Sequence, residues 1–158
     1  MLHLRAWVTP FAPRDCLLTA SGDMMPGFGL PEVTRGTLPG SGGTQRLARL
    51  VGLGRALDLA LSGEHVKAEQ ALDMGLISRL VTRIELWPEA EALAQKIAGH
   101  APLSVLLVKE AVRNSLDTDL PTGLRIEADL STLIASTEDR VEAGKAFREK
   151  RKPVFKGR

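Results

Sequence analysis

From Thr44 onward, glycine and proline divide the sequence into segments in which apolar residues recur at helical spacing. In the segment 85–98 the members of such a stripe are Leu86, Ala90, Leu93, Ala94 and Ile97. An apolar stripe is the ordinary way in which a helix buries one face, so these stripes predict faces that meet a core or a neighbouring subunit rather than a cofactor. A chain patterned in this way is expected to fold into a helix-rich structure.

The same punctuation predicts where the elements begin and end. Helices are expected over Thr44–Val51, Gly54–Ser62, Lys67–Met74, Glu85–Ala98, from Pro102, from Pro121 and over Thr137–Lys150, and an extended segment over Ile77–Thr82. Thr44 and Thr137 are placed to cap their helices through their hydroxyl groups. Gly63 is expected to close its helix, Gly75 to stand in the C-terminal position that favours a left-handed conformation, and Pro153 to end the last helix.

Residues 1–27 follow a different pattern. Prolines and glycines interrupt every apolar run there, so we expect irregular structure with one short strand around Cys16–Ala20. The sequence therefore predicts three regions: an atypical N-terminal segment (1–27), the last part of a folded core (28–84) and a C-terminal helical region (85–158).

Composition restricts the partners. Only 4% of the residues are aromatic against 44% apolar, so aliphatic side chains must fill the core. A net charge of +2 gives no reason to expect nucleic acid or a membrane as partner. The single cysteine, Cys16, can form neither an internal disulfide nor a metal cluster, which indicates a reducing compartment. No apolar run is long enough to span a bilayer. We expect a cytoplasmic protein, with the mitochondrial matrix as the alternative.

The most informative segment runs from Phe28 to Leu47. Glu32 lies there among apolar neighbours, which allow partial burial of its side chain, although from the residues alone an exposed position is the favoured interpretation for a glutamate after a proline. A partly buried carboxyl can both give and take a proton. The following turn, Gly40-Ser41-Gly42-Gly43-Thr44, lacks the lysine of a phosphate-binding P-loop and is better interpreted as a tight turn that offers backbone amides at a helix start.

This segment resembles the "FG-PE…G-IPG-GGTQRL" signature of the enoyl-CoA hydratase/isomerase (crotonase) family. Three later stretches agree in order: Ala56–Leu76 with "A-(D/E)-L-(L/A)-TG…A-EA…GL(V/I)", Ala101–Ala111 with "AP-A…-KEA", and Glu138–Gly157 with "EDR-EG-AF-EKR-P-F-G". The resemblance covers residues 28–158 and implies the C-terminal part of an α/β, crotonase-like (ββα spiral) fold with trailing oligomerisation helices. It also implies self-association as a trimer or hexamer.

The resemblance further implies an acyl-CoA thioester as ligand. It implies no metal or redox cofactor, and coenzyme A itself is part of the substrate. Glu32 matches the glutamate that handles the proton at the α-carbon. Gly40 matches a glycine whose backbone amide lies near the catalytic water.

Four further residues are implied to bind substrate. Leu30 and Pro31 flank the matched glutamate and are expected to line the substrate site. Phe147 and Lys150 match positions whose side chains lie near bound coenzyme A, often across a subunit boundary, and Lys150 is placed to pair with a phosphate. A solvated lysine in a basic tail is the alternative interpretation.

One part of the family pattern is not matched. Counting back by the family spacing from Glu32 leads to Thr9-Pro10-Phe11-Ala12, where the second glutamate and an oxyanion-hole amide are expected, and no glutamate or glycine run stands there. Losing one oxyanion donor costs on the order of a hundredfold in rate or more. The hypotheses are therefore an enoyl-CoA hydratase or isomerase acting through Glu32, a catalytically inactive truncated paralogue that serves as an oligomerisation module, and an RNA-binding relative that uses its basic C-terminal tail.

Overall fold

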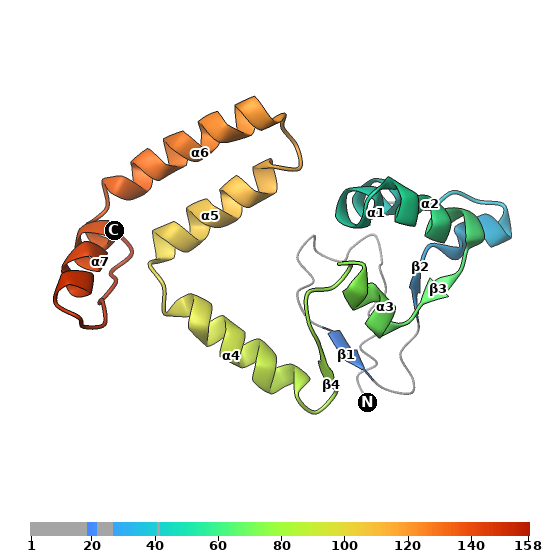
Figure 1. Cartoon of the computed structure of the whole chain (residues 1–158), viewed down its shortest axis with the longest axis horizontal. Coiled ribbons are helices and arrows are strands. Elements are labelled where there is room, and N and C mark those ends of the chain that lie inside the picture. Colours follow the sequence, from blue (N-terminus) through green and yellow to red (C-terminus); the bar gives the residue numbers. More distant parts are fainter. Residues whose placement is uncertain (1–18, 22–26, 41) are drawn as a thin grey trace. The chain divides into compact units, whose positions relative to one another are not determined.

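The computed structural model describes residues 19–21, 27–40 and 42–158. The contacts within the chain divide it into two compact units, Met1–Ala90 and Glu91–Arg158, with the boundary inside one helix (Figure 1). The proposed strand at Cys16–Ala20 falls partly outside the described residues, as do Cys16 itself and positions 9–12. Each unit is described below by itself.

The first unit contains short strands and helices that alternate along the chain. They are β1 (Thr19–Ser21), β2 (Phe28–Gly29), the 3₁₀ helix η1 (Pro31–Arg35), α1 (Gly43–Val51), α2 (Leu53–Ser62), β3 (His65–Val66), α3 (Ala68–Asp73) and β4 (Leu80–Thr82). β2 pairs antiparallel with β3, where Phe28 lies opposite Val66. β1 pairs in parallel with β4, where Thr19 lies opposite Leu80. The extended segment expected over Ile77–Thr82 is a strand only in its second half.

The core of the first unit is aliphatic, as the composition predicted. In α1 the buried Leu47 and Val51 are four residues apart, and in α2 Ala56 and Leu59 are three apart, so each helix turns one stripe inward. The complete buried cluster consists of Phe28, Leu30, Leu47, Val51, Ala56, Leu59, Ala68, Ala71, Leu76 and Ile77. This cluster joins the strand that precedes η1 to the helices that follow it.

Two glycines set the start of α1 and the end of α2. Gly63 ends α2, as predicted, and does so in the left-handed conformation, with φ of 68°. The prediction that Thr44 caps α1 is wrong: Gly42, with φ of 83°, is the N-cap, and Thr44 lies inside the helix. Glycine can adopt this conformation without strain, so the turn itself starts the helix without a side-chain cap.

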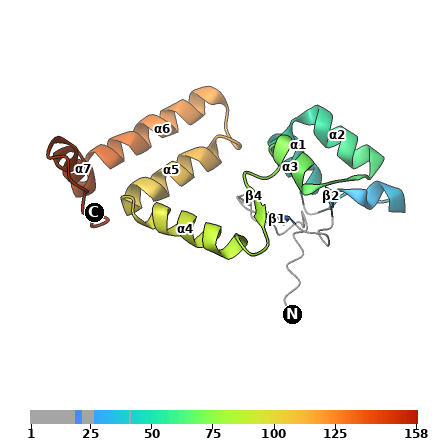
Figure 2. The same cartoon turned by 60° about the horizontal axis from the view of Figure 1, so that its bottom comes forward.

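The second unit consists of the end of α4 (Leu86–Ala98), followed by α5 (Pro102–Asn114), α6 (Leu120–Ala135) and α7 (Glu138–Arg148). Figures 1 and 2 show α5 and α6 side by side and antiparallel. Pro102 occupies the first turn of α5, as predicted. Thr137 caps α7, as predicted, since its hydroxyl oxygen accepts a hydrogen bond from the Arg140 amide at 3.2 Å.

The apolar stripes of the second unit are less covered than a core requires. Neither α4 nor α5 contains a buried residue, and Leu106, Val112 and Leu133 are each more than half exposed. Of the two predicted alternatives, α4 and α5 therefore do not form faces of a core within the chain, and a face that meets a neighbouring subunit stays a prediction. Among the described residues, no helix has the length and apolar content to cross a bilayer.

Candidate active site

Glu32 lies on η1, a short helix that is held by its own side chains. Pro31 fixes the backbone at the first helical position, and Gly36 ends the helix with φ of 69°. The Thr34 hydroxyl donates to the carbonyl of Pro31 at 2.7 Å. The carbonyl of Glu32 accepts from both the amide and the hydroxyl of Thr37, each at 3.2 Å. The backbone that carries the Glu32 carboxyl is thereby fixed.

The Glu32 side chain is partly buried, as its apolar neighbours allowed, and not exposed as its residue type favoured. Its Oε2 atom is withdrawn from solvent and has no hydrogen-bond partner among the described residues. Most buried polar atoms in proteins have a partner, and leaving a carboxylate oxygen without one is costly. An unsatisfied acceptor of this kind, on a rigid turn, indicates a place where a donor from outside these residues binds.

The glycine turn before α1 packs against the residue that anchors η1. A methyl group built on Gly43 would lie 3.1 Å from Leu30 Cδ2 and 3.5 Å from Pro39 Cβ, so only glycine fits without a shift. The Gly43 amide donates to the Gly40 carbonyl at 3.2 Å, which closes the turn. Gly40 itself is exposed, with open space where a side chain would be. The structure thus brings Leu30, the start of η1 and the glycine turn together.

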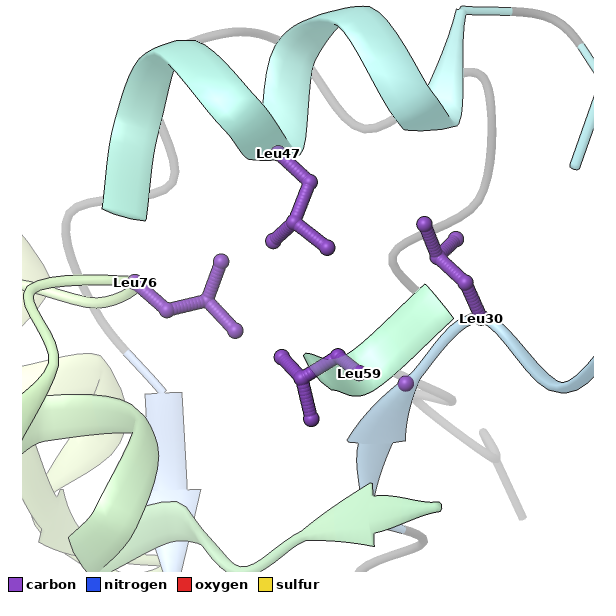
Figure 3. Close-up of a pocket in the computed structure, with 5 residues that line it drawn as sticks. Leu30, Leu47, Leu59 and Leu76 are labelled. Atoms are coloured by element: carbon purple, nitrogen blue, oxygen red, sulfur yellow. The ribbon is translucent and has the colours of Figure 1, made fainter. Parts of the chain in front are cut away.

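Leu30 contributes to this arrangement from the core side. It is only 3% exposed and lines a cavity with Gly29, Leu47, Leu59 and Leu76. Figure 3 shows the four leucine side chains converging on this space. The cavity measures about 10 Å³, which is enough for at most one water molecule. It is therefore a packing gap beneath η1 and too small for an acyl chain. Contact of Leu30 or the half-buried Pro31 with a ligand stays a prediction.

The other two predicted binding residues lie in the second unit. Phe147 is 86% exposed near the end of α7, and Lys150 is exposed just beyond it. The prediction that this helix continues to about Lys150 and ends at Pro153 is wrong. It ends at Arg148, and Lys150 turns the chain with φ of 51°, while its amide donates to the Phe147 carbonyl at 3.2 Å.

The two arginines of the basic tail that follows α7 are paired with carboxylates. Both terminal nitrogens of the Arg151 guanidinium bind Glu142, and its Nε donates to Glu149. The Arg151 guanidinium, together with the Val154 amide, lowers the pKa of Glu142 to about 2, and Glu142 in turn raises the pKa of Arg151. Arg158 pairs with Glu138 at 3.2 Å. Arginines 151 and 158 are therefore not free to form a nucleic-acid surface.

Asp139 is a structural residue whose role the sequence did not reveal. Its carboxylate is 2% exposed and accepts the amides of Lys156 at 2.7 Å and Gly157 at 2.9 Å. The Asp139 amide donates to the Arg158 carbonyl at 3.2 Å. The sequence suggested only a favourable charge near the start of α7. The structure shows that this carboxylate fastens the tail to the helix.

Solved structures with a similar fold include enoyl-CoA hydratases. One from Bacillus anthracis is 40% identical, with a TM-score of 0.82, and the match covers 89% of this chain and 54% of that one. One from Mycobacterium tuberculosis H37Rv is 31% identical, with a TM-score of 0.80, and the match covers 91% and 56%. These neighbours and the alternation of short strands and helices identify a crotonase fold, as predicted.

A family model described as enoyl-CoA hydratase/isomerase matches residues 18–158. The chain therefore belongs to the enoyl-CoA hydratase/isomerase family. The 2,3-dehydroadipyl-CoA hydratase of Escherichia coli K12 is 48% identical over 131 residues, which cover 83% of this chain and 51% of the relative. A short-chain-enoyl-CoA hydratase of Clostridioides difficile is 46% identical over 121 residues, covering 77% and 78%. This chain spans about half the length of most of the curated relatives it matches.

Proposed function

We propose that this chain binds acyl-CoA and takes part in enoyl-CoA hydratase or isomerase chemistry on a 2-enoyl-CoA thioester, with Glu32 as the acid and base at the α-carbon. The observation that carries the proposal is the buried Oε2 atom of Glu32, which has no partner among the described residues. A substrate C–H group or a catalytic water would occupy that place.

The geometry supports proton transfer in a definite way. The Thr37 bonds hold the Glu32 backbone, and one carboxylate oxygen is dry, so the carboxyl needs little reorganisation when a proton moves. In hydration, an O–H bond of water breaks as its oxygen bonds to the β-carbon, the Glu32 carboxyl gives its proton to the α-carbon, and the proton that water loses restores the Glu32 carboxyl. In isomerisation, Glu32 removes a proton from one carbon and returns it to another.

Both reactions place negative charge on the thioester oxygen. Preorganised N–H donors must stabilise that charge, and this is commonly the largest single contribution to such catalysis. We assign no described residue to this pair of donors. Gly40, whose surroundings are open, is proposed as the amide beside the catalytic water.

The second unit supplies the proposed contacts to coenzyme A. Phe147 offers an exposed ring and Lys150 an exposed ammonium group three residues later. An aromatic face suits a nucleobase and a lysine suits a phosphate. The mitochondrial relatives from Dictyostelium discoideum and mouse keep the matrix open as an alternative to the cytoplasm that we propose.

The test compares the wild-type chain with Glu32→Gln and with a matched control, Glu64→Gln. Glu64 is an exposed glutamate in the same unit, so this control removes the same charge. We expect Glu32→Gln to lower the rate of crotonyl-CoA hydration, and of α-proton exchange in D₂O, by about 10²–10⁴-fold. The control should retain the wild-type rate. No turnover at high protein concentration, or an unchanged rate in Glu32→Gln, would reject the proposal.

A second function, as an oligomerisation module without catalysis, is favoured by one observation. The helices α4 and α5 leave large apolar side chains exposed, and neither buries a residue. Such faces commonly meet another subunit. Gel filtration combined with calorimetry against an acyl-CoA separates the two functions, because the module would form an oligomer and give no binding heat.

A further inference from the structure

Lys150 is the one non-glycine residue with positive φ in the part of the chain that the structure describes. Its φ of 51° falls in the left-handed region, where a Cβ atom crowds the backbone. Helices that end in this way usually place glycine at the corresponding position. A residue kept in a disfavoured conformation indicates that its side chain has a use, provided that its surroundings hold it there.

Arg151 and Glu142 provide those surroundings. The Arg151 guanidinium binds both carboxylate oxygens of Glu142, binds Glu149 through Nε and donates to the Lys152 carbonyl at 3.2 Å. Glu142 also accepts the amide of Val154 at 3.0 Å. The chain that follows Lys150 is thus tied to one carboxylate on α7 through Arg151 and Val154, and Glu149, which precedes Lys150, is tied to Arg151. We call this set of contacts, made by Glu142, Glu149, Arg151, Lys152 and Val154, the tail clamp.

The two neighbouring cations, Lys150 and Arg151, differ in how their charges are paired. Arg151 is matched by two carboxylates, so its guanidinium has little positive charge to offer a ligand. Lys150 has no carboxylate within ion-pair distance among the described residues. A planar, forked guanidinium suits the clamp, while a compact ammonium suits a phosphate.

We propose that Arg151, fixed by Glu142, is a positioning residue for coenzyme A. It holds the left-handed turn so that the exposed Lys150 and Phe147 form one recognition element, a cation for a phosphate next to a ring for the base. This inference rests on the proposed acyl-CoA function and adds to it the residues that set the geometry of nucleotide recognition. It makes Lys150 and Phe147 act together, because the Lys150 amide is bonded to the Phe147 carbonyl.

Calorimetry on the full chain tests the inference with two probes. One is crotonyl-CoA, and the other is the crotonyl thioester of N-acetylcysteamine, which lacks the nucleotide. We expect Arg151→Met to raise the Kd for crotonyl-CoA about tenfold, as for loss of one charge-assisted contact, and to leave the Kd for the short thioester unchanged. Arg140→Met, which removes the same charge from the exposed first turn of α7, is the matched control and should bind both probes as the wild type does.

Lys150→Gly separates a recognition role from a structural one. Glycine relieves the backbone conformation, so this variant should unfold at the same temperature as the wild type or a higher one, yet bind crotonyl-CoA about tenfold more weakly. If Lys150→Gly binds crotonyl-CoA normally, or if Arg151→Met weakens both probes equally, the inference is overturned. Absence of turnover with an intact difference between the two probes would reject the proposed catalysis while supporting this inference.

Discussion

Replacing Asp139 should detach the C-terminal tail and destabilise the second unit. The carboxylate is 2% exposed and accepts two backbone amides, at 2.7 and 2.9 Å. Asp139→Ala leaves both donors without an acceptor, at about 1–3 kcal/mol each. Because the freed tail can turn its amides toward water, we expect a total loss near the lower end, about 2–4 kcal/mol. Asp139→Asn retains one carbonyl oxygen and should lose about half as much.

Two measurements check this prediction. Urea denaturation gives the free energy of unfolding of each variant, and hydrogen exchange reports on the amides of Lys156 and Gly157 individually. Both amides should lose protection in Asp139→Ala, while Asp129→Ala, at an exposed position on α6, should behave as the wild type does. An Asp139→Ala variant within about 0.5 kcal/mol of wild type, with both amides still protected, would show that the carboxylate does not hold the tail.

Three further predictions concern a core leucine, two glycine positions, and the ion pair between Glu142 and Arg151. Leu59→Ala, at a site only 3% exposed, should lower the free energy of unfolding by about 2–5 kcal/mol in urea denaturation, and a loss under 1 kcal/mol would contradict the assigned core. Gly63→Ala should destabilise by about 1–3 kcal/mol, since φ is 68° and the new methyl would lie 2.5 Å from Thr34 Cγ2. Gly54→Ala, with open space at its Cβ, should stabilise α2 by about 0.5–1 kcal/mol, and thermal melts that rank the two alanine variants the other way would refute this. The lowered pKa of Glu142 means that its contribution to stability is complete above its ordinary value of 4.5 and is lost as the pH falls from there toward 2. The free energy of unfolding, measured as the pH is lowered from 4.5 toward 2, should therefore fall less steeply in Glu142→Gln than in the wild type. Equal slopes in the two proteins would contradict this role of Glu142.

Local signals predicted the helices well. Gly63 ended α2 because glycine adopts the left-handed conformation without strain, and Pro102 began α5 because its ring fixes φ near the helical value. Thr44 was misassigned as a cap because Gly42 adopts a left-handed conformation that no spacing reveals. The end of α7 was also missed, since lysine is a good helix former and the contacts that bend the chain at Lys150 come from Glu142, elsewhere on the helix.

The candidate site could be predicted only where its residues are consecutive in the sequence. The apolar neighbours of Glu32 allowed its partial burial, but its residue type favoured exposure, so coordinates were needed to decide. The family followed from ordered motifs. Asp139 could not be identified as buried, because its partners are backbone amides 17 and 18 residues downstream and amides carry no sequence signal. The exposed apolar stripe of α5 has the same periodicity as a core stripe, so its exposure could be recognised only from the coordinates.

The parallel pairing of β1 with β4 also sets an order of events during synthesis. Thr19 leaves the ribosome long before its partner Leu80 exists, and α1, α2 and α3 are made in between. Contacts so distant in sequence form late, since the intervening chain must first become compact. The first described strand of the protein is therefore among the last elements to find its place, and a nascent chain that stalls before Leu80 has no partner strand to offer it.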